Sequence, residues 1–335
     1  MDQPAQPSIP PTLASVRENA KVLAGHLNRT PVIRWPQDAL RLPVSEKTDL
    51  WLKLELLQVA GSFKLRSALT VVGKLSAEQK QHGVVTVSAG NFAIACAGAA
   101  RTYGTTATIF MSHHADPYRV ARAKALGADI RLVENHSTAF ADARALAANE
   151  SRTFVHPFDG PNNTLGTASI ALELDADLPR TVNTFVVAVG GGSLISGLAP
   201  TIKALRPGAI VYGVEPVGAR TLHDSVKLGR PTSEPPTGTI ADSLAPPWAE
   251  PYSFGLVRDF VDEILLVEDE AILAAMKITF RGLRMAVEPA AAVALAAILG
   301  NPQRFQGGVC AVVCGSNIGM ERYAKFIGGL PDDIG

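Results

Sequence analysis

The stretch "TFVVAVGGGSLISGLAPTIKAL", residues 184–205, passes from a β-rich apolar run through three glycines into a segment of helical period. A strand that leads through a tight turn into a helix is the repeating unit of parallel sheets covered by helices. The alternation recurs along the chain, and strands are predicted at residues 49–55, 83–88, 106–111, 129–133, 153–157, 184–190, 210–215, 263–268 and 309–315. Helices are predicted between them, at residues 91–104, 116–127, 139–149, 193–205 and 270–286. The sequence therefore predicts an α/β fold.

The composition limits the possible partners. Hydrophobic residues make up 47% of the 335 residues and charged residues 19%, as is typical of a globular protein. The 31 basic and 31 acidic residues cancel, so no charge excess favours nucleic acid or an anionic membrane. The most apolar run, residues 289–299, is too short to cross a bilayer and predicts a buried helix. Cys96, Cys310 and Cys314 are too few for a secreted disulfide framework, which favours a cytoplasmic protein with a small-molecule partner.

Four junctions between predicted strands and helices are rich in small or polar residues. They are "SAGN" (88–91), "GGGS" (190–193), "VEPVGA" (214–219) and "CGSN" (314–317). Ligands of open α/β sheets bind beyond the carboxyl ends of strands, where helix N-termini offer free N–H groups. Each junction alone is also compatible with a plain tight turn. Together they predict one crevice, and the proline-rich stretch 227–253 is long enough to be a functional loop beside it.

The glycine run predicts a phosphate site, because its backbone amides and the following helix N-terminus favour an anion. A dinucleotide fold is one interpretation, since Glu215 ends the next predicted strand, but Ile195 occupies the third glycine position of the G-x-G-x-x-G pattern. A nucleoside triphosphate loop would need a Gly-Lys-Ser or Gly-Lys-Thr sequence, which does not follow the glycines. A cofactor with a small terminal phosphate is the remaining expectation.

Seven ordered motifs carry a resemblance to a known family. They are "LKLELLQVAGSFKLRSAL" (52–69), "SAGNFA" (88–93), "GGGSLISG" (190–197), "GVEP" (213–216), "TIADSLA" (239–245), "VEPAAAVALAAI" (287–298) and "CGSNI" (314–318). The chain resembles the fold type II pyridoxal-phosphate enzymes, which have a tryptophan synthase β-like fold, and within them the threonine dehydratase and serine racemase branch. The resemblance implies two intertwined α/β domains, each with a mostly parallel sheet. Residues 1–70 and 160–335 would form the large cofactor domain, and residues 71–159 the small one.

The resemblance also implies roles for individual residues. Lys64 would form the Schiff base with pyridoxal 5'-phosphate, although a solvated helix lysine is the usual alternative. The other implied cofactor contacts are Phe63 beneath the ring, Asn91 at its phenolic oxygen, Gly190, Gly191, Gly192, Ser193 and Leu194 around the phosphate, Cys314 at the pyridine nitrogen, and Glu288. The implied substrate contacts are Ser88, Ala89, Gly90, Asn91 and Phe92 around the carboxylate, and Ser243. Taken alone, Asn91 is also compatible with a helix cap, Phe63 with plain core and Cys314 with a buried strand cysteine.

The reaction implied is α,β-elimination from a β-hydroxy-α-amino acid, with Lys64 removing the α-proton and a 2-oxo acid and ammonia as products. Relatives that racemise carry a serine where this chain has Ala89, so elimination is expected rather than racemisation. Phe92 replaces the usual histidine and Ser243 the usual glycine. The pocket is therefore expected to be more apolar and differently shaped than one built for threonine. The substrate is expected to be threonine- or serine-like, and a bulkier one, such as a phenylserine, a hydroxyaspartate or an amino acid derived from a compatible solute, stays possible.

Some alternatives remain open. Glu215, the backbone of Ala219 and Thr221 match a divalent-cation site of some relatives, but Thr221 stands where an acid is expected. No metal is predicted for that reason. An amino-acid racemase of the same family, a nicotinamide-dependent oxidoreductase and a non-catalytic ligand-binding protein are the other functions to consider. The resemblance further implies a homo-oligomer, either a dimer or a tetramer.

Overall fold

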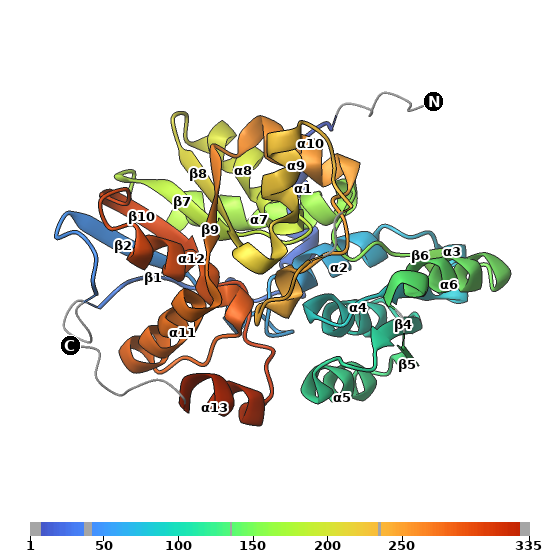
Figure 1. Cartoon of the computed structure of the whole chain (residues 1–335). Coiled ribbons are helices and arrows are strands. Elements are labelled where there is room, and N and C mark those ends of the chain that lie inside the picture. The colour runs from blue at the N-terminus through green and yellow to red at the C-terminus, as the bar shows by residue number, and fades with distance from the viewer. Residues whose placement is uncertain (1–7, 37–41, 135, 234–235, 329–335) are drawn as a thin grey trace.

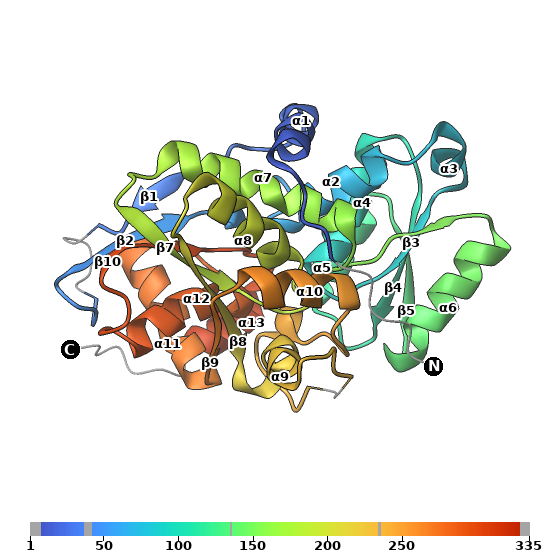
Figure 2. The same cartoon turned by 90° about the horizontal axis from the view of Figure 1, so that it is seen from above.

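The computed structural model describes residues 8–36, 42–134, 136–233 and 236–328. Two separate sheets lie side by side (Figures 1 and 2). The strands are β1 Val32–Arg34, β2 Thr48–Lys53, β3 Val84–Val87, β4 Ala107–Ser112, β5 Asp129–Val133, β6 Thr153–Phe154, β7 Val182–Ala188, β8 Ile210–Pro216, β9 Glu263–Val267 and β10 Gly307–Val312. The helices are α1 Leu13–Leu23, α2 Lys64–Gly73, α3 Ala77–His82, α4 Asn91–Thr102, α5 Pro117–Ala125, α6 His136–Asn149, α7 Pro161–Asp177, α8 Ser193–Leu205, α9 Thr221–Leu228, α10 Pro251–Phe260, α11 Asp269–Leu283, α12 Pro289–Gly300 and α13 Met320–Gly328, with 3₁₀ turns η1 Glu55–Leu57, η2 Val217–Ala219 and η3 Asp242–Leu244. The predicted α/β fold is confirmed.

The six-stranded sheet has the order β1-β2-β10-β7-β8-β9. Its strands run parallel except at the β1–β2 edge, and β2 pairs with β10, so residues 48–53 lie beside residues 307–312. Helices α7 and α8 cover one face, and α11 and α12 lie on the other (Figures 1 and 2). Residues Pro289–Ile298 of α12 are buried all round, as expected for a helix without a polar face.

The four-stranded sheet has the order β5-β4-β3-β6 and is parallel throughout. Successive side chains of a strand point to opposite faces. Val84 of β3 accordingly belongs to the core beneath α4, whereas Val85 and Val87 belong to the core beneath α6. Both faces of this sheet are therefore covered by helices, which explains why its strands are apolar runs rather than alternating ones.

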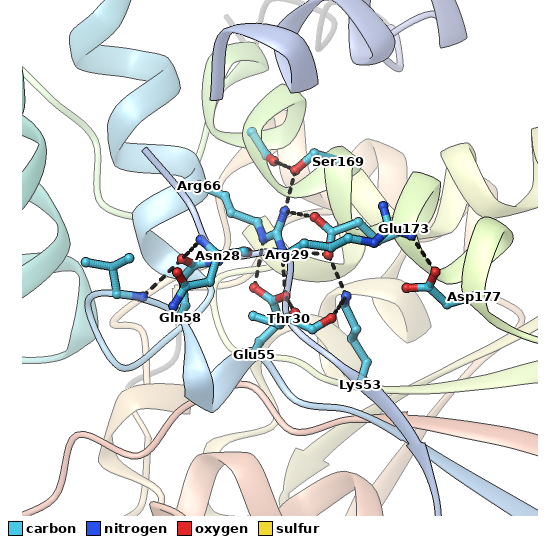
Figure 3. A network of polar contacts seen from close by, with 12 residues as sticks. Asn28, Arg29, Thr30, Lys53, Glu55, Gln58, Arg66, Ser169, Glu173 and Asp177 are labelled. Carbon is cyan, nitrogen blue, oxygen red and sulfur yellow. Dashed lines mark hydrogen bonds and ion pairs between the residues drawn. The ribbon is translucent and has the colours of Figure 1, made fainter. Parts of the chain in front are cut away.

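A buried ionic network ties the start of α2 to the six-stranded sheet and to α7 (Figure 3). The guanidinium of Arg66 donates to Glu55 at 2.8 Å and to Glu173 at 2.8 Å. The ammonium of Lys53, which is fully buried in β2, donates to Glu173 and to the carbonyl oxygen of Thr30. Since buried charges need partners, this network fixes α2 two residues after Lys64.

The structure also differs from the sequence predictions. The strand predicted at 153–157 is only Thr153–Phe154. The N–H of Val155 still donates to Val85 at 2.8 Å, but the carbonyl oxygen of Val155 accepts the hydroxyl group of Thr86 at 2.7 Å instead of a backbone N–H. The strand β1 and the helices α1, α3, α7, α9, α10 and α13 were not predicted. The domain boundaries at residues 70 and 160 stay a prediction, and α2 continues across the first of them. Within the described ranges, no helix combines the length and the apolar character needed to span a bilayer.

Candidate active site

A cavity of about 330 Å³ lies where the carboxyl ends of strands from both sheets meet. Residues that follow β3, β7 and β10 line it, so the junctions at 88–91, 190–193 and 314 form one crevice as predicted. The junction at 214–219 does not take part, because Val217 and Gly218 line a second, smaller cavity. The predicted site residues that line the large cavity are Phe63, Lys64, Ser88, Ala89, Gly90, Asn91, Phe92, Gly190, Gly191, Gly192, Ser193, Leu194, Ser243, Glu288 and Cys314.

Lys64 is the first residue of α2, and its side chain faces the cavity. Its Nζ atom donates to the carbonyl oxygen of Pro157 at 3.0 Å and to Oγ of Ser193 at 2.8 Å. The amine lies 5.1 Å from the ring centre of Phe63 and 5.8 Å from that of Phe92. Burial lowers the pKa of Lys64 from 10.5 to about 7, because the charged form loses its hydration. The amine is therefore hydrogen-bonded to protein groups at the cavity, and its role in a Schiff base stays a prediction.

The glycine run links β7 to α8 and brings the helix N-terminus to the cavity. Gly192 has a φ of +91°, a conformation that side chains other than glycine rarely adopt. A Cβ atom on Gly191 would lie 2.2 Å from the ring of Phe158, so a larger residue would not fit there. The first amides of α8, beginning at Ser193, have no partners within the helix and point their partial positive charge at the cavity. This arrangement suits a phosphate group.

Asn91 is held by side chains from distant parts of the chain. Its carboxamide oxygen accepts a hydrogen bond from Nδ2 of Asn317 at 2.6 Å, and its Nδ2 atom donates to Glu288. The other carboxylate oxygen of Glu288 accepts from Arg119 at 3.1 Å. Burial raises the pKa of the Glu288 carboxyl, although the Arg119 guanidinium opposes this effect. Gly90, not Asn91, is the N-cap residue of α4, so the helix-cap alternative for Asn91 is wrong.

Cys314 follows β10 and presents a neutral thiol to the cavity. Burial, together with the nearby Glu288 carboxylate, raises its pKa well above the usual value. The thiol lies 3.6 Å from the carbonyl oxygen of Ala290, to which it can donate. Cys310 and Cys96 are also buried, and all three cysteines are free.

Glu215, Ala219 and Thr221, the residues considered for a divalent cation, lie between the end of β8 and the start of α9. The Glu215 carboxylate accepts N–H groups of Leu222 at 3.0 Å and His223 at 2.8 Å, at the start of α9. Burial raises its pKa to about 8. In the described part of the chain, no group of three or more His, Cys, Asp or Glu side chains is placed to hold a metal ion. The Glu215 carboxylate therefore caps the N-terminus of α9. A cation held by this one carboxylate and by backbone oxygens stays an open alternative.

Several residues that line the cavity were not predicted from the sequence. They are Val87, Ser112, His114, Ala115, Arg119, Phe140, Pro157, Phe158, Ala188, Leu244, Ala245, Pro246, Pro247, Ala290 and Asp242. The proline-rich stretch 227–253 did signal a functional loop, and its residues 242–247 line the cavity. The carboxyl end of β6 could have pointed to Phe158. No local signal marks Phe140, which lies inside α6 and has the sequence context of a core residue.

Comparison with known proteins identifies the family. Residues 23–315 match the family model described as pyridoxal-phosphate dependent enzyme. The chain belongs to this family of enzymes, and its cofactor is pyridoxal phosphate. The neighbouring structures have the fold type II architecture that the sequence predicted. The nicotinamide-dependent and non-catalytic alternatives are therefore wrong.

Three relatives illustrate the similarity. The chain is 38% identical to phenylserine dehydratase from Ralstonia pickettii over 85% of this chain and 90% of that protein. It is 34% identical to L-threonine ammonia-lyase from Thermotoga maritima, over 94% and 78% of the two chains. Among solved structures, maize serine racemase superposes with a TM-score of 0.88 at 30% identity, covering 95% of this chain and 97% of the other.

The residues present fit pyridoxal phosphate. An aldehyde needs a neutral primary amine, and Lys64 has a lowered pKa and faces the cavity. A phosphate needs free amides, which the start of α8 offers beside Gly192. A heteroaromatic ring needs flanking apolar surface, which Phe63 can provide. The cavity thus offers groups suited to the aldehyde, the phosphate and the ring of the cofactor.

Proposed function

We propose that this enzyme is an ammonia-lyase that converts a β-hydroxy-α-amino acid to a 2-oxo acid and ammonia. One observation carries the proposal: a desolvated amine at Lys64 shares a cavity with a phosphate-binding helix end and the neutral thiol of Cys314. The lyase reading is also supported by relatives that are named as a phenylserine dehydratase and a threonine ammonia-lyase.

Pyridoxal phosphate, when bound, supplies an aldehyde that takes up amines and a conjugated ring that accepts electrons from the substrate's α carbon. We propose that residues 190–194 hold its phosphate and that Phe63 lies beneath its ring. Asn91, fixed by Glu288 and Asn317, would bind the phenolic oxygen. Cys314 would face the ring nitrogen as a neutral group, which cannot keep that nitrogen protonated as a carboxylate would. A weaker electron sink suits a reaction in which a leaving hydroxyl takes the electrons.

Lys64 is proposed as the base. With a pKa near 7 its amine is substantially neutral at neutral pH, so it can take the α-proton. The carbonyl oxygen of Pro157 and Oγ of Ser193 are placed to accept hydrogen bonds from the ammonium that forms. The electrons of the α C–H bond form a double bond, and the C–O bond at the β carbon breaks. The β-hydroxyl takes up one proton and leaves as water, which balances the α-proton removed by Lys64. Water then replaces the amino nitrogen of the product, which releases ammonia and the 2-oxo acid. The net reaction therefore needs no oxidant.

The substrate carboxylate is proposed to bind the loop from Ser88 to Phe92, whose last residues open α4 and carry unpaired amides. Ala89 in that loop has a methyl group, which cannot give a proton to the second face of the α carbon. We therefore propose elimination rather than racemisation. Rapid interconversion of D and L substrates by the purified enzyme would show that a second acid or base exists.

The test is a panel of β-hydroxy-α-amino acids incubated with holoenzyme, with ammonia and 2-oxo acid measured together. Equal amounts of the two products from at least one member are expected, and Lys64→Ala should form neither. A holoenzyme that carries lysine-linked cofactor but releases ammonia from no member of the panel would overturn the proposal.

Three further expectations remain proposals. The division into residues 1–70 with 160–335 and residues 71–159 agrees with the two sheets, because the strands of the smaller sheet all lie between residues 84 and 154. Limited proteolysis and hydrogen exchange would test it. A homo-oligomer, dimer or tetramer, can be tested by sedimentation, and a cytoplasmic location by cell fractionation.

A further inference from the structure

One wall of the cavity consists of apolar residues that none of the proposed roles uses. We call Val87, Phe140, Phe158, Pro246 and Pro247 the aromatic wall. Val87 and Phe140 belong to the hydrophobic cluster between the four-stranded sheet and α6, and Phe158 packs against that cluster. The wall therefore has contributions from β3, α6, the turn after β6 and the proline-rich loop, which lie far apart in the sequence.

The rings of the aromatic wall are held from behind. Phe140 packs edge to face on Trp248, with ring centres 4.9 Å apart, and the ring of His156 lies 4.6 Å from that of Phe158. Trp248 donates to the Glu250 carboxylate at 2.6 Å, and the same carboxylate oxygen lies 3.1 Å from Nε2 of His156. Since the backing residues are themselves hydrogen-bonded, the wall is organised before a ligand binds, which reduces the entropy lost on binding.

The charges around the cavity disfavour a second carboxylate on the substrate. Arg119 is buried, and its guanidinium is bound by Glu288 and by both oxygens of Asp242. Its Nε atom donates to the carbonyl oxygen of Asn317 at 2.8 Å. Among the residues that line the cavity, the other basic groups are Lys64, which the proposed chemistry uses, and the imidazole of His114, which is exposed to solvent. A β-carboxylate would therefore meet apolar rings and the Asp242 carboxylate.

We infer that the β-substituent of the substrate is an aromatic ring, which packs against Phe140 and Phe158. The inference rests on the proposed lyase activity and narrows its substrate class. A methyl group, as in threonine, would leave most of the wall uncovered, and each missing methylene in an apolar pocket lowers kcat/KM by roughly 10-fold or more. A β-aryl substrate is therefore expected to exceed threonine and 3-hydroxyaspartate by at least about 100-fold in kcat/KM.

The experiment compares Phe140→Leu with Phe154→Leu in the holoenzyme. Phe154 lies in the same aromatic cluster, with its ring centre 6.3 Å from that of Phe140, but does not line the cavity. Phe140→Leu should lower kcat/KM for 3-phenylserine by roughly 10-fold and that for threonine by less than about 3-fold. Phe154→Leu should change neither by more than about 2-fold. Thermal melts of both variants check that the fold is kept.

A second measurement does not depend on turnover. L-Phenylalanine carries the ring but no β-hydroxyl leaving group, so its dissociation constant can be measured by calorimetry against that of L-alanine. Tighter binding of L-phenylalanine, weakened in Phe140→Leu but not in Phe154→Leu, would support the inference. Threonine or 3-hydroxyaspartate used as well as 3-phenylserine would overturn it, and so would equal effects of the two variants. If no β-hydroxy amino acid is turned over, the lyase proposal fails, and the analogue affinities alone decide the aromatic subsite.

Discussion

The Nζ atom of Lys64 donates a hydrogen bond to the carbonyl oxygen of Pro157, 3.0 Å away. The amine at the start of α2 is thus held by the turn that follows β6 in the other sheet. His156 supports this turn, since its Nδ1 atom accepts the N–H of Asp159 at 3.0 Å. The position of the amine therefore depends on the turn after β6 as well as on α2.

The pKa of Lys64 predicts how the apoenzyme captures its cofactor. Burial lowers this pKa to about 7, so the neutral amine rises from about a tenth of the population at pH 6 to about nine tenths at pH 8. The rate at which the apoenzyme forms lysine-linked cofactor should therefore increase up to pH 8 and then level off. The visible absorbance of the linked cofactor measures this rate. The Lys64→Arg variant is the control, because it should form no lysine-linked cofactor at this position. A rate that keeps rising to pH 10 would indicate an ordinary lysine.

The cysteines should be unreactive in the folded protein. Burial raises the pKa of Cys96 and Cys310 to about 12 and that of Cys314 well above its usual value. Because the thiolate is the reactive form, a thiol reagent at pH 8 should modify no cysteine of the native protein. All three should react after unfolding in guanidinium chloride. Rapid labelling of one native thiol would show that a cysteine is exposed to solvent.

Removal of one partner from the buried ionic network should destabilise the protein far more than removal of one partner from an exposed ion pair beside it. Arg66→Leu leaves the carboxylates of Glu55 and Glu173 without their main partner, which should cost about 3–5 kcal/mol in the free energy of unfolding. The matched control is Arg29→Leu, which breaks the exposed pair with Asp177 seen in Figure 3 and should cost less than about 1 kcal/mol. Urea unfolding measures both. Similar losses in the two variants would contradict this prediction.

Glu215 should make stability fall with rising pH. Its pKa is about 8 in the folded protein and 4.5 in the unfolded chain, so the folded state binds more protons between these values. The stabilisation that the protonated Glu215 carboxyl provides is complete below pH 4.5 and is lost as the pH rises through 8. The free energy of unfolding falls over this range by at most about 1.4 kcal/mol per pH unit. Glu215→Gln keeps an oxygen that can accept an N–H of α9 but does not titrate.

The measurement is the free energy of unfolding of wild type and Glu215→Gln at pH 5, 7 and 9. The stability of the variant relative to wild type should increase from the first pH to the last. Glu18→Gln is the control, because Glu18 is exposed and pairs only with Lys21 at 3.4 Å among the contacts described. A constant difference across the three pH values would show that Glu215 is ionised throughout.

The sequence predicted those parts of the fold whose signals are local. Helix α8 begins at Ser193 and ends at Leu205 as predicted, because a glycine turn precedes it and its apolar period is regular. Strand β5, Asp129–Val133, also matches. By contrast, β1 has three residues at a sheet edge, and so short a segment carries no periodicity. Helix α7 was missed because it is buried on most sides and lacks an amphipathic pattern.

The residues of the candidate site also fall into two groups, those that could be predicted from the local sequence and those that could not. Asn91 and the glycine run lie in short motifs that directly follow strands, and Lys64 lies in a short motif at the start of a helix. Each of these motifs could be found in the local sequence. Phe140 and Arg119 reach the cavity only because α6 and α5 pack on particular faces of the four-stranded sheet. Their own sequence neighbourhoods resemble those of an ordinary core phenylalanine and a surface arginine. The tertiary structure was therefore needed to identify the side chains that shape the substrate end of the cavity.

The pairing of β2 with β10 has a consequence for the order of events during translation. Residues 48–53 find their parallel partner only when residues 307–312 have left the ribosome, so Lys64 and Cys314 cannot face each other earlier. The four-stranded sheet uses one continuous stretch, residues 84–154, and closing short loops costs less entropy than closing long ones. The nascent chain can thus complete the small sheet first, and the reactive amine faces Cys314 only after residues 307–314 have been synthesised.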